Sequence, residues 1–103
     1  DRYRWNDRNL ALLFEQVGLI PEQRERIRAW PQRKSLRAAP QGRGRDRYAV
    51  IRDVSMSFGG SHQGLDAMWF WTTSLDEAMD EATAFNEEYG LAVCVAKLVG
   101  QIS

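Results

Sequence analysis

Apolar residues in the first third of the chain recur with the period of an α-helix. The residues at positions i, i+3, i+4 and i+7 are Leu10, Leu13, Phe14 and Val17. Asn6 precedes them as a favourable N-cap, and Gly18 follows them as a helix stop. Pro21 suits the first turn of another helix, which Pro31 would end. The pattern therefore predicts two helices within residues 1–31.

An alternation with a period of two appears in the second half of the chain. Residues 32–46 show neither period and contain Pro and Gly, so they are expected to form a loop. Residues 47–58 alternate and predict a strand, and residues 59–66 are expected to be a turn-rich loop. Residues 67–72 and 91–99 are apolar on both faces, with Lys97 as the exception, which is typical of strands inside a sheet.

Residues 75–89 carry the strongest helix pattern in the chain. Ser74 and Glu77 match the S-x-x-E capping box at its start, and Gly90 is placed to end it with a positive φ. The expected apolar stripe consists of Leu75, Ala78, Met79, Ala82, Phe85 and Tyr89. A capped helix between two apolar strands predicts a βαβ unit, in which the two strands are parallel.

The helix at 75–89 can cover only one face of a sheet, so the N-terminal helices are expected to cover the other. We therefore predict one domain over residues 1–103, an α/β (α+β) sandwich of element order ααββαβ. Its parts would be a helical region (1–31), a loop (32–46) and a ββαβ sheet region (47–103). The sheet would be mixed and three-stranded, with a parallel βαβ crossover and with the first strand antiparallel to the second. The predicted core includes Trp69, Phe70, Val93, Val95 and Leu98.

The composition is that of an ordinary globular domain. Of 103 residues, 44% are hydrophobic and 27% are charged, which is unlike disordered chains. No apolar run is long enough to span a membrane and the N-terminus does not resemble a signal peptide, so we expect a cytoplasmic protein. Cys94 lies in an apolar run and is expected to be buried. One His and one Cys cannot build a typical zinc site, and we expect no metal or cofactor.

Charge is distributed very unevenly between the two halves. Residues 1–52 contain thirteen cations and six acids, a net charge of +7, whereas residues 53–103 contain one cation and eight acids, a net charge of −7. Such asymmetry favours a macromolecular partner over a small ligand. A partner that is a nucleic acid or a larger protein is therefore the first expectation.

Residues 24–47 hold nine cations, eight of them Arg, against two acids. The planar guanidinium binds phosphate or carboxylate in a bidentate manner, so this segment is predicted to contact a nucleic acid or an acidic protein surface. The expected contact residues are Arg24, Arg28, Arg33, Lys34, Arg37, Arg43, Arg45 and Arg47. A solvated surface in an Arg-rich protein would have the same composition.

The helix at 75–89 carries six acids and no cation. Like charges at i and i+4 destabilise a helix, and so do carboxylates near its C-terminus. A basic partner would relieve both effects, so the alternative function is a small inhibitory or regulatory protein that docks through this helix. The predicted interaction residues are Asp76, Asp80, Glu81, Glu87 and Glu88. Arginines of the same chain, or of a second copy in a self-associated form, would relieve it equally.

The segment from Phe70 to Val99 consists of a strand, the sequence T-S-L-D-E-A, the acidic helix, Gly90 and an apolar strand. It resembles small proteins of phages and mobile elements, including inhibitors of host defence systems such as anti-CRISPR proteins. The resemblance spans about a third of the chain, and any capped strand–helix–strand unit reproduces it. The resemblance supports the inhibitor as an alternative function.

Catalysis is not expected, because no acid, base and nucleophile stand at a spacing that brings them together. The catalytic alternative is a small nuclease. In it His62, the only histidine, would act as acid or base in the Gly-rich loop and Arg43 or Arg45 would stabilise the transition state.

Overall fold

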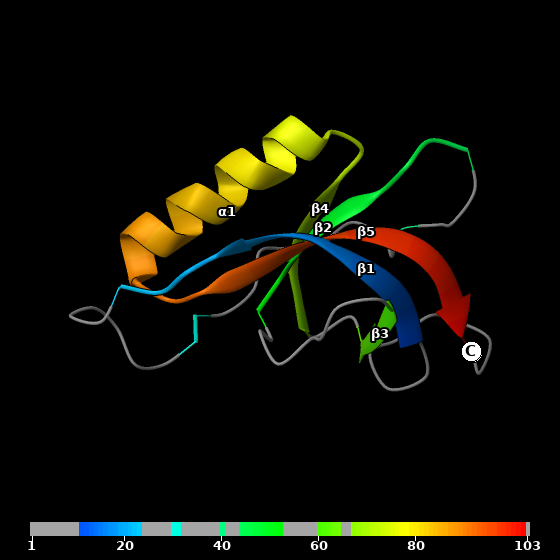
Figure 1. Ribbon diagram of the computed structural model, residues 1–103, viewed down its shortest axis with the longest axis horizontal. Helices are drawn as coiled ribbons and strands as arrows, with labels where there is room; N and C mark the ends of the chain where they lie inside the picture. The colour runs from blue at the N-terminus through cyan, green and yellow to red at the C-terminus, as the bar shows by residue number, and fades with distance from the viewer. Residues whose placement is uncertain are drawn as a thin grey trace.

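The computed structural model describes residues 11–23, 30–31, 40, 44–52, 60–64 and 67–102. These residues form an antiparallel sheet with one helix on one face (Figure 1). In chain order the elements are β1 (Ala11–Ile20), β2 (Tyr48–Ile51), β3 (Gly60–Gly64), β4 (Met68–Thr72), α1 (Leu75–Tyr89) and β5 (Val93–Ile102). Their order in the sheet is β3-β1-β5-β2-β4. The main sheet consists of β1, β5, β2 and β4, and β3 adds a short fifth strand next to β1. The fold mixes α and β structure as expected.

The predicted three-stranded sheet with a parallel βαβ crossover is wrong. The strands on either side of α1, β4 and β5, do not pair with each other, because β2 lies between them and is antiparallel to both. They point in the same direction but are separated by one strand. The expected antiparallel pairing of β2 with β4 is present, with Tyr48 opposite Thr72 and Val50 opposite Phe70. The tight turns around α1 therefore indicated a crossover between two strands of the same direction. They did not indicate that β2 lies between these strands.

β1 replaces the first predicted helix from Ala11 onward, so the order ααββαβ is also wrong; the predicted N-cap Asn6 and Leu10 lie outside the described residues. Its residues pair with β5 along the whole strand and with β3 over Ala11 to Glu15. The sequence of β1 is ambiguous, because Leu12 and Phe14, two positions apart, also fit one face of a strand. Hydrogen bonds from neighbouring strands decide in favour of the extended form. Residues 21–23 are not helical, and 24–29 of the second predicted helix lie outside the described residues.

The predicted loop at 59–66 is also corrected in part. Gly60–Gly64 forms β3, whose backbone pairs antiparallel with β1, with Ser61 opposite Phe14 and Gly64 opposite Ala11. Glycines are poor strand formers, so no propensity favours a strand here. The edge of β1 provides the hydrogen-bonding partners that local sequence does not indicate. Residues 53–58, the end of the predicted first strand, lie outside the described residues.

The helix α1 confirms the sequence prediction at both ends. Ser74 is the N-cap and its hydroxyl accepts a hydrogen bond from the Glu77 amide at 3.2 Å, while Gly90 ends the helix with φ 69° and ψ 26°. In the reciprocal half of the capping box, Thr72 bridges the Ser74 amide and the Glu77 carboxylate. Thr72 Oγ1 accepts from the Ser74 amide at 3.2 Å and donates to the Glu77 carboxylate. The side chain of Thr72, the last residue of β4, thereby connects that strand to the first turn of α1.

The face of the sheet under α1 holds the larger aromatic core. Phe85 is buried, and its ring centroid lies 4.8 Å from that of Trp69 in an edge-to-face arrangement. The ring centroids of Tyr89 and Trp30 lie 5.0 and 5.9 Å from that of Phe85 and complete the cluster. The other buried residues on this face are Val50, Ala78, Ala82, Leu91, Val93 and Val95. Of the predicted core, Trp69, Val93, Val95 and Leu98 are buried and Phe70 is partly buried. Leu75, expected in the stripe, is 40% exposed.

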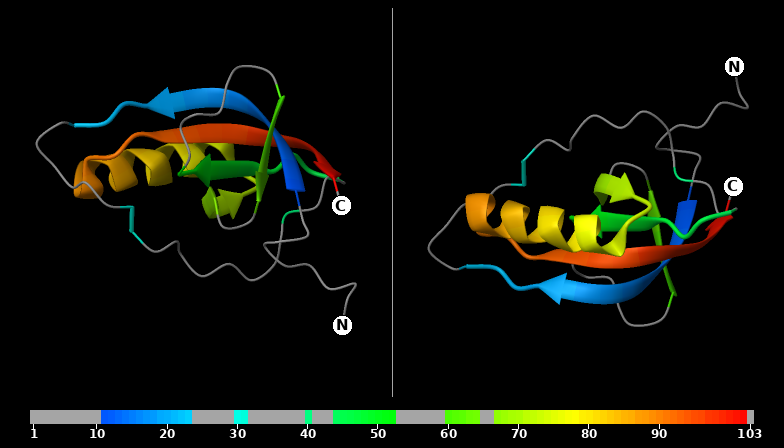
Figure 2. Two further views of the ribbon diagram at one scale, coloured as in Figure 1. Left: turned by 90° about the horizontal axis from the view of Figure 1, so that it is seen from below. Right: turned by 90° about the horizontal axis from the view of Figure 1, so that it is seen from above.

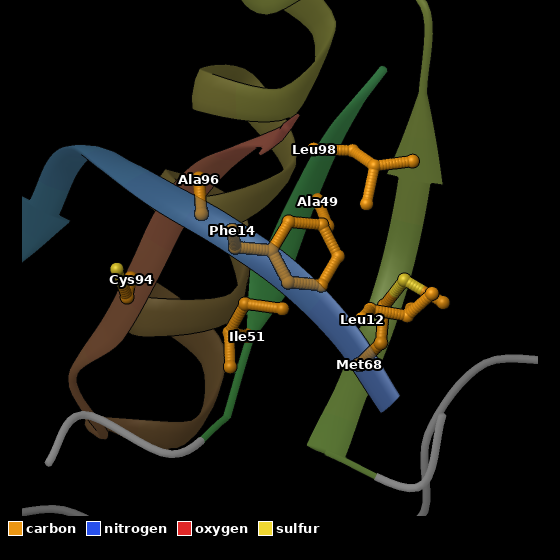
Figure 3. Packing of buried hydrophobic residues seen from close by; sticks show 8 residues of the cluster. All are labelled: Leu12, Phe14, Ala49, Ile51, Met68, Cys94, Ala96 and Leu98. Carbon is orange, nitrogen blue, oxygen red and sulfur yellow. The ribbon is translucent and has the colours of Figure 1, made fainter. Parts of the chain in front are cut away.

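A second hydrophobic cluster lies on the opposite face of the sheet. Its members are Leu12, Phe14, Ala49, Ile51, Met68, Cys94, Ala96 and Leu98, with the Phe14 ring among them (Figure 3). Cys94 is 1% exposed, and burial raises the pKa of its thiol to about 11. The thiol therefore stays protonated near neutral pH and acts as a small apolar side chain, as expected.

Three bulges distribute side chains between the two faces. Trp69 is the extra residue of β4, because Val50 faces Phe70 and Ile51 faces Met68. A bulge places two successive side chains on one face, so Trp69 and Phe70 both pack toward α1. Trp69 and Trp71, which strict alternation along a strand would place on the same face, therefore lie on opposite faces. Similar irregularities near Val17 in β1 and Val99 in β5 accompany the curvature of these strands in Figure 1.

Candidate functional site

The six carboxylates of α1 divide into two stripes. At about 100° per residue, positions four and eleven apart fall close to the same side of a helix. Asp76, Asp80 and Glu87 have this spacing and form the outer stripe, which lies opposite the buried residues of α1. Glu77, Glu81 and Glu88 have the same spacing and form the inner stripe, rotated toward β4.

The inner stripe is engaged within the molecule. The Glu77 carboxylate accepts a hydrogen bond from Thr72 of β4, and Glu81 and Glu88 each take part in an interaction within the chain. Glu81 is half-buried. The acids of the inner stripe therefore have interactions within the chain, and the predicted contact roles of Glu81 and Glu88 stay a prediction.

The outer stripe is open to solvent. Asp76, Asp80 and Glu87 are exposed, and none of them forms an ion pair with a cation in the described part of the chain. The last turn of α1 contains no basic residue. Asp76 and Asp80 repel each other at a cost of about 0.2–0.5 kcal/mol, and Glu87 lies at the end of the helix where a negative charge is unfavourable. The fold thus keeps three carboxylates exposed on one side of the helix, of which Asp76 and Asp80 repel each other and Glu87 lies at the unfavourable end of the helix dipole.

Most of the predicted Arg-rich surface lies outside the described residues, including Arg24, Arg28, Arg33, Lys34, Arg37 and Arg43. Arg45 is exposed in an irregular segment before β2, as the loop prediction required. Arg47 is half-buried, with its guanidinium 6.0 Å from the Trp71 ring centroid and hydrogen-bonded to the carbonyl of Arg45. Asp46 Oδ2 forms an ion pair with Lys97 Nζ at 3.6 Å. Arg45 is accessible to a partner, whereas Arg47 is used to cover Trp71.

Among the described residues, the structure assigns no catalytic or metal-binding contact to the remaining sequence candidates. His62 belongs to β3 and its backbone pairs with Leu13 of β1. Within the described residues no group of three His, Cys, Asp or Glu side chains could hold a metal ion. No helix in this part of the chain is long and apolar enough to cross a membrane. The nuclease hypothesis for His62 stays a prediction.

The outer stripe of α1 is therefore the best-defined candidate surface. The sequence pattern placed all of its acids on the polar side of the helix but did not distinguish the outer stripe from the inner one. Comparison of the chain with known protein families, curated proteins and solved structures finds no match to any of them.

Proposed function

We propose that this protein is a non-enzymatic binding module that contacts a basic macromolecular surface through Asp76, Asp80 and Glu87. The observation that carries the proposal is the contrast between the two stripes of one helix. The inner acids have partners within the chain, whereas the outer acids are exposed without a cation among the described residues.

The length of the outer stripe points to the kind of partner. Asp76 and Glu87 are eleven residues apart, which corresponds to about 16 Å along a helix axis. Carboxylates spread over this distance cannot converge on one metal ion or one small cation. They match a row of several Lys or Arg side chains on a protein, such as a surface that itself binds phosphates. A protein with this property would act as an inhibitor or regulator by occupying that surface.

The first prediction concerns neutralisation of the outer stripe. The variant D76N/D80N/E87Q should bind a labelled oligolysine peptide at least about tenfold more weakly than the wild type, because exposed ion pairs contribute up to about 1 kcal/mol each. Fluorescence anisotropy at low ionic strength measures the dissociation constant. Circular dichroism should show an unchanged fold, since these side chains are exposed.

A control variant separates the stripe from net charge. Glu15, Glu22 and Asp46 are three exposed acids outside α1, and E15Q/E22Q/D46N changes the net charge by the same amount. We expect this variant to bind oligolysine within about twofold of the wild type. Equal weakening in both variants would mean that only net charge matters, and the proposed surface would be rejected.

A second candidate function is binding of a polyanion by the segment at 24–47. The observation in its favour is that Arg45 is exposed near the C-terminal end of that segment, where its carbonyl accepts a hydrogen bond from Arg47. The +7 charge of residues 1–52 supports the same proposal. Nucleic acid or an acidic protein surface would be the partner.

The second prediction tests this candidate. At low salt the wild type should bind DNA or RNA, with an affinity that falls steeply as salt increases because counterions are released from phosphates. The variant R33E/K34E/R37E should bind at least about tenfold more weakly. Gel-shift titration with both nucleic acids measures the effect. If the wild type does not bind either nucleic acid at micromolar concentration, the nucleic-acid form of this proposal is excluded.

A further inference from the structure

Half of the outer edge of β1 has no neighbouring strand within the described residues. β3 pairs with β1 over Ala11 to Glu15 only, whereas β5 pairs with the opposite edge of β1 as far as Ile20. Within the described residues, the segment Gln16 to Ile20 therefore has a neighbouring strand on one side only, and Figure 2 shows this half of β1 at the boundary of the sheet. An open edge presents unpaired backbone N–H and C=O groups that can pair with another strand.

The side chains of this edge are unusually apolar. Val17 is 44% exposed and Leu19 is 51% exposed. Protein edges are commonly protected by charged residues or proline within the strand, and the sequence from Gln16 to Ile20 contains neither. The bulge near Val17 is the one protective feature present. The edge thus combines backbone groups that no described strand pairs with and two apolar side chains that a partner strand would cover.

The open edge is also held in place. The carbonyl of Pro21 accepts a hydrogen bond from the Asn86 side chain, and the amide of Gln23 donates to the carbonyl of Gly90 at 3.2 Å. Both contacts anchor the chain beyond Ile20 to the C-terminal end of α1. A rigid edge loses little conformational entropy when another strand pairs with it, which favours association.

We propose that a second copy of this chain occupies the edge, with Gln16 to Ile20 of the two copies paired antiparallel about a two-fold axis at Gly18. In this register Val17 faces Leu19 of the second copy, and the reverse pair forms by symmetry. It is the register in which the two open segments overlap completely. Ile20 of the second copy then lies opposite Gln16. The neighbouring residue Glu15 already pairs with Gly60 of β3, so the new pairing ends where β3 begins.

Three features of the edge are compatible with a second copy as its occupant. The edge is self-complementary in its apolar side chains, no charged residue lies within the paired segment, and the chain carries no net charge that would oppose association. The two-fold axis is perpendicular to the sheet, so both α1 helices lie on one face of the joined sheet. Because the paired segment is short, the dimer is expected to be weak, with a dissociation constant in the micromolar to millimolar range.

The third prediction tests the dimer by sedimentation equilibrium between about 10 μM and 1 mM. The average mass of the wild type should rise with concentration from 11.8 kDa toward twice that value. V17K/L19K should remain monomeric, because the ammonium group at position 17 would face the one at position 19 of the second copy. V17E/L19K should dimerise again, because a carboxylate at position 17 would then face that ammonium group, and this dimer should weaken as salt increases.

V99K provides the matched control. Val99 is 49% exposed and belongs to β5, away from the open edge, so its replacement should leave dimerisation unchanged. Three results would overturn the proposal: a wild type that stays monomeric at 1 mM, a V17K/L19K variant that still dimerises, or a V17E/L19K variant that does not recover. In the first case a strand of another protein becomes the alternative occupant of the edge. None of these results depends on the acidic stripe of α1.

Discussion

Replacing Phe85 with alanine is expected to lower the free energy of unfolding by about 3–5 kcal/mol, a large part of the stability of a domain of this size. Phe85 is 1% exposed and is the central ring of the cluster formed with Trp69, Tyr89 and Trp30. Removal of its ring would leave a cavity between α1 and the sheet. It would also abolish the edge-to-face contact with Trp69.

Urea denaturation followed by tryptophan fluorescence and circular dichroism measures this loss. L75A is the control, because Leu75 lies on the same helix but is 40% exposed, and we expect it to cost less than about 1 kcal/mol. A loss for F85A no larger than that for L75A would show that α1 does not depend on this aromatic cluster.

Replacing Asn86 with leucine is expected to cost about 2–4 kcal/mol, although the two side chains are similar in size. Asn86 is buried, and its amide nitrogen donates to the carbonyls of Pro21 and Leu91 while its oxygen accepts from Gln23. Leucine would leave both carbonyls without their donor. Buried polar groups without partners carry most of the cost.

The same denaturation experiment measures this variant, with Q23A as its control. Gln23 is exposed and its side chain contributes a hydrogen bond at 3.2 Å to Asn86, so Q23A should cost less than about 1 kcal/mol. Hydrogen exchange of the Gln23 and Gly90 amides should become faster in N86L. A loss for N86L below that for Q23A would contradict the role assigned to the Asn86 amide.

The helix α1 is the element that sequence alone predicted best, because every signal that defines it is local. Ser74, Glu77 and Gly90 act within one turn of the helix end, and the apolar stripe repeats with the period of the helix itself. The acidic face follows from the same periodicity. The separation of its outer and inner stripes required the position of β4, because Thr72 reaches Glu77 only in the folded sheet.

The N-terminal part of the sheet could not be predicted in this way. In β1 the helical and extended patterns coexist, and the choice depends on pairing with β5, a strand more than seventy residues later in the chain. The strand β3 has no apolar pattern, and its place depends on the edge of β1. The bulge at Trp69 similarly depends on the register between β2 and β4.

Local sequence was sufficient to predict α1, its caps, the burial of Cys94 and the presence of an acidic helix face. Long-range pairing established that β1 is a strand, that β2 separates β4 from β5, and which acids and which strand edge lack a partner among the described residues. The difference lies in the range of the interactions. Helix hydrogen bonds and caps join residues that are close in sequence, whereas an antiparallel sheet is held by hydrogen bonds between distant segments whose register no local pattern specifies.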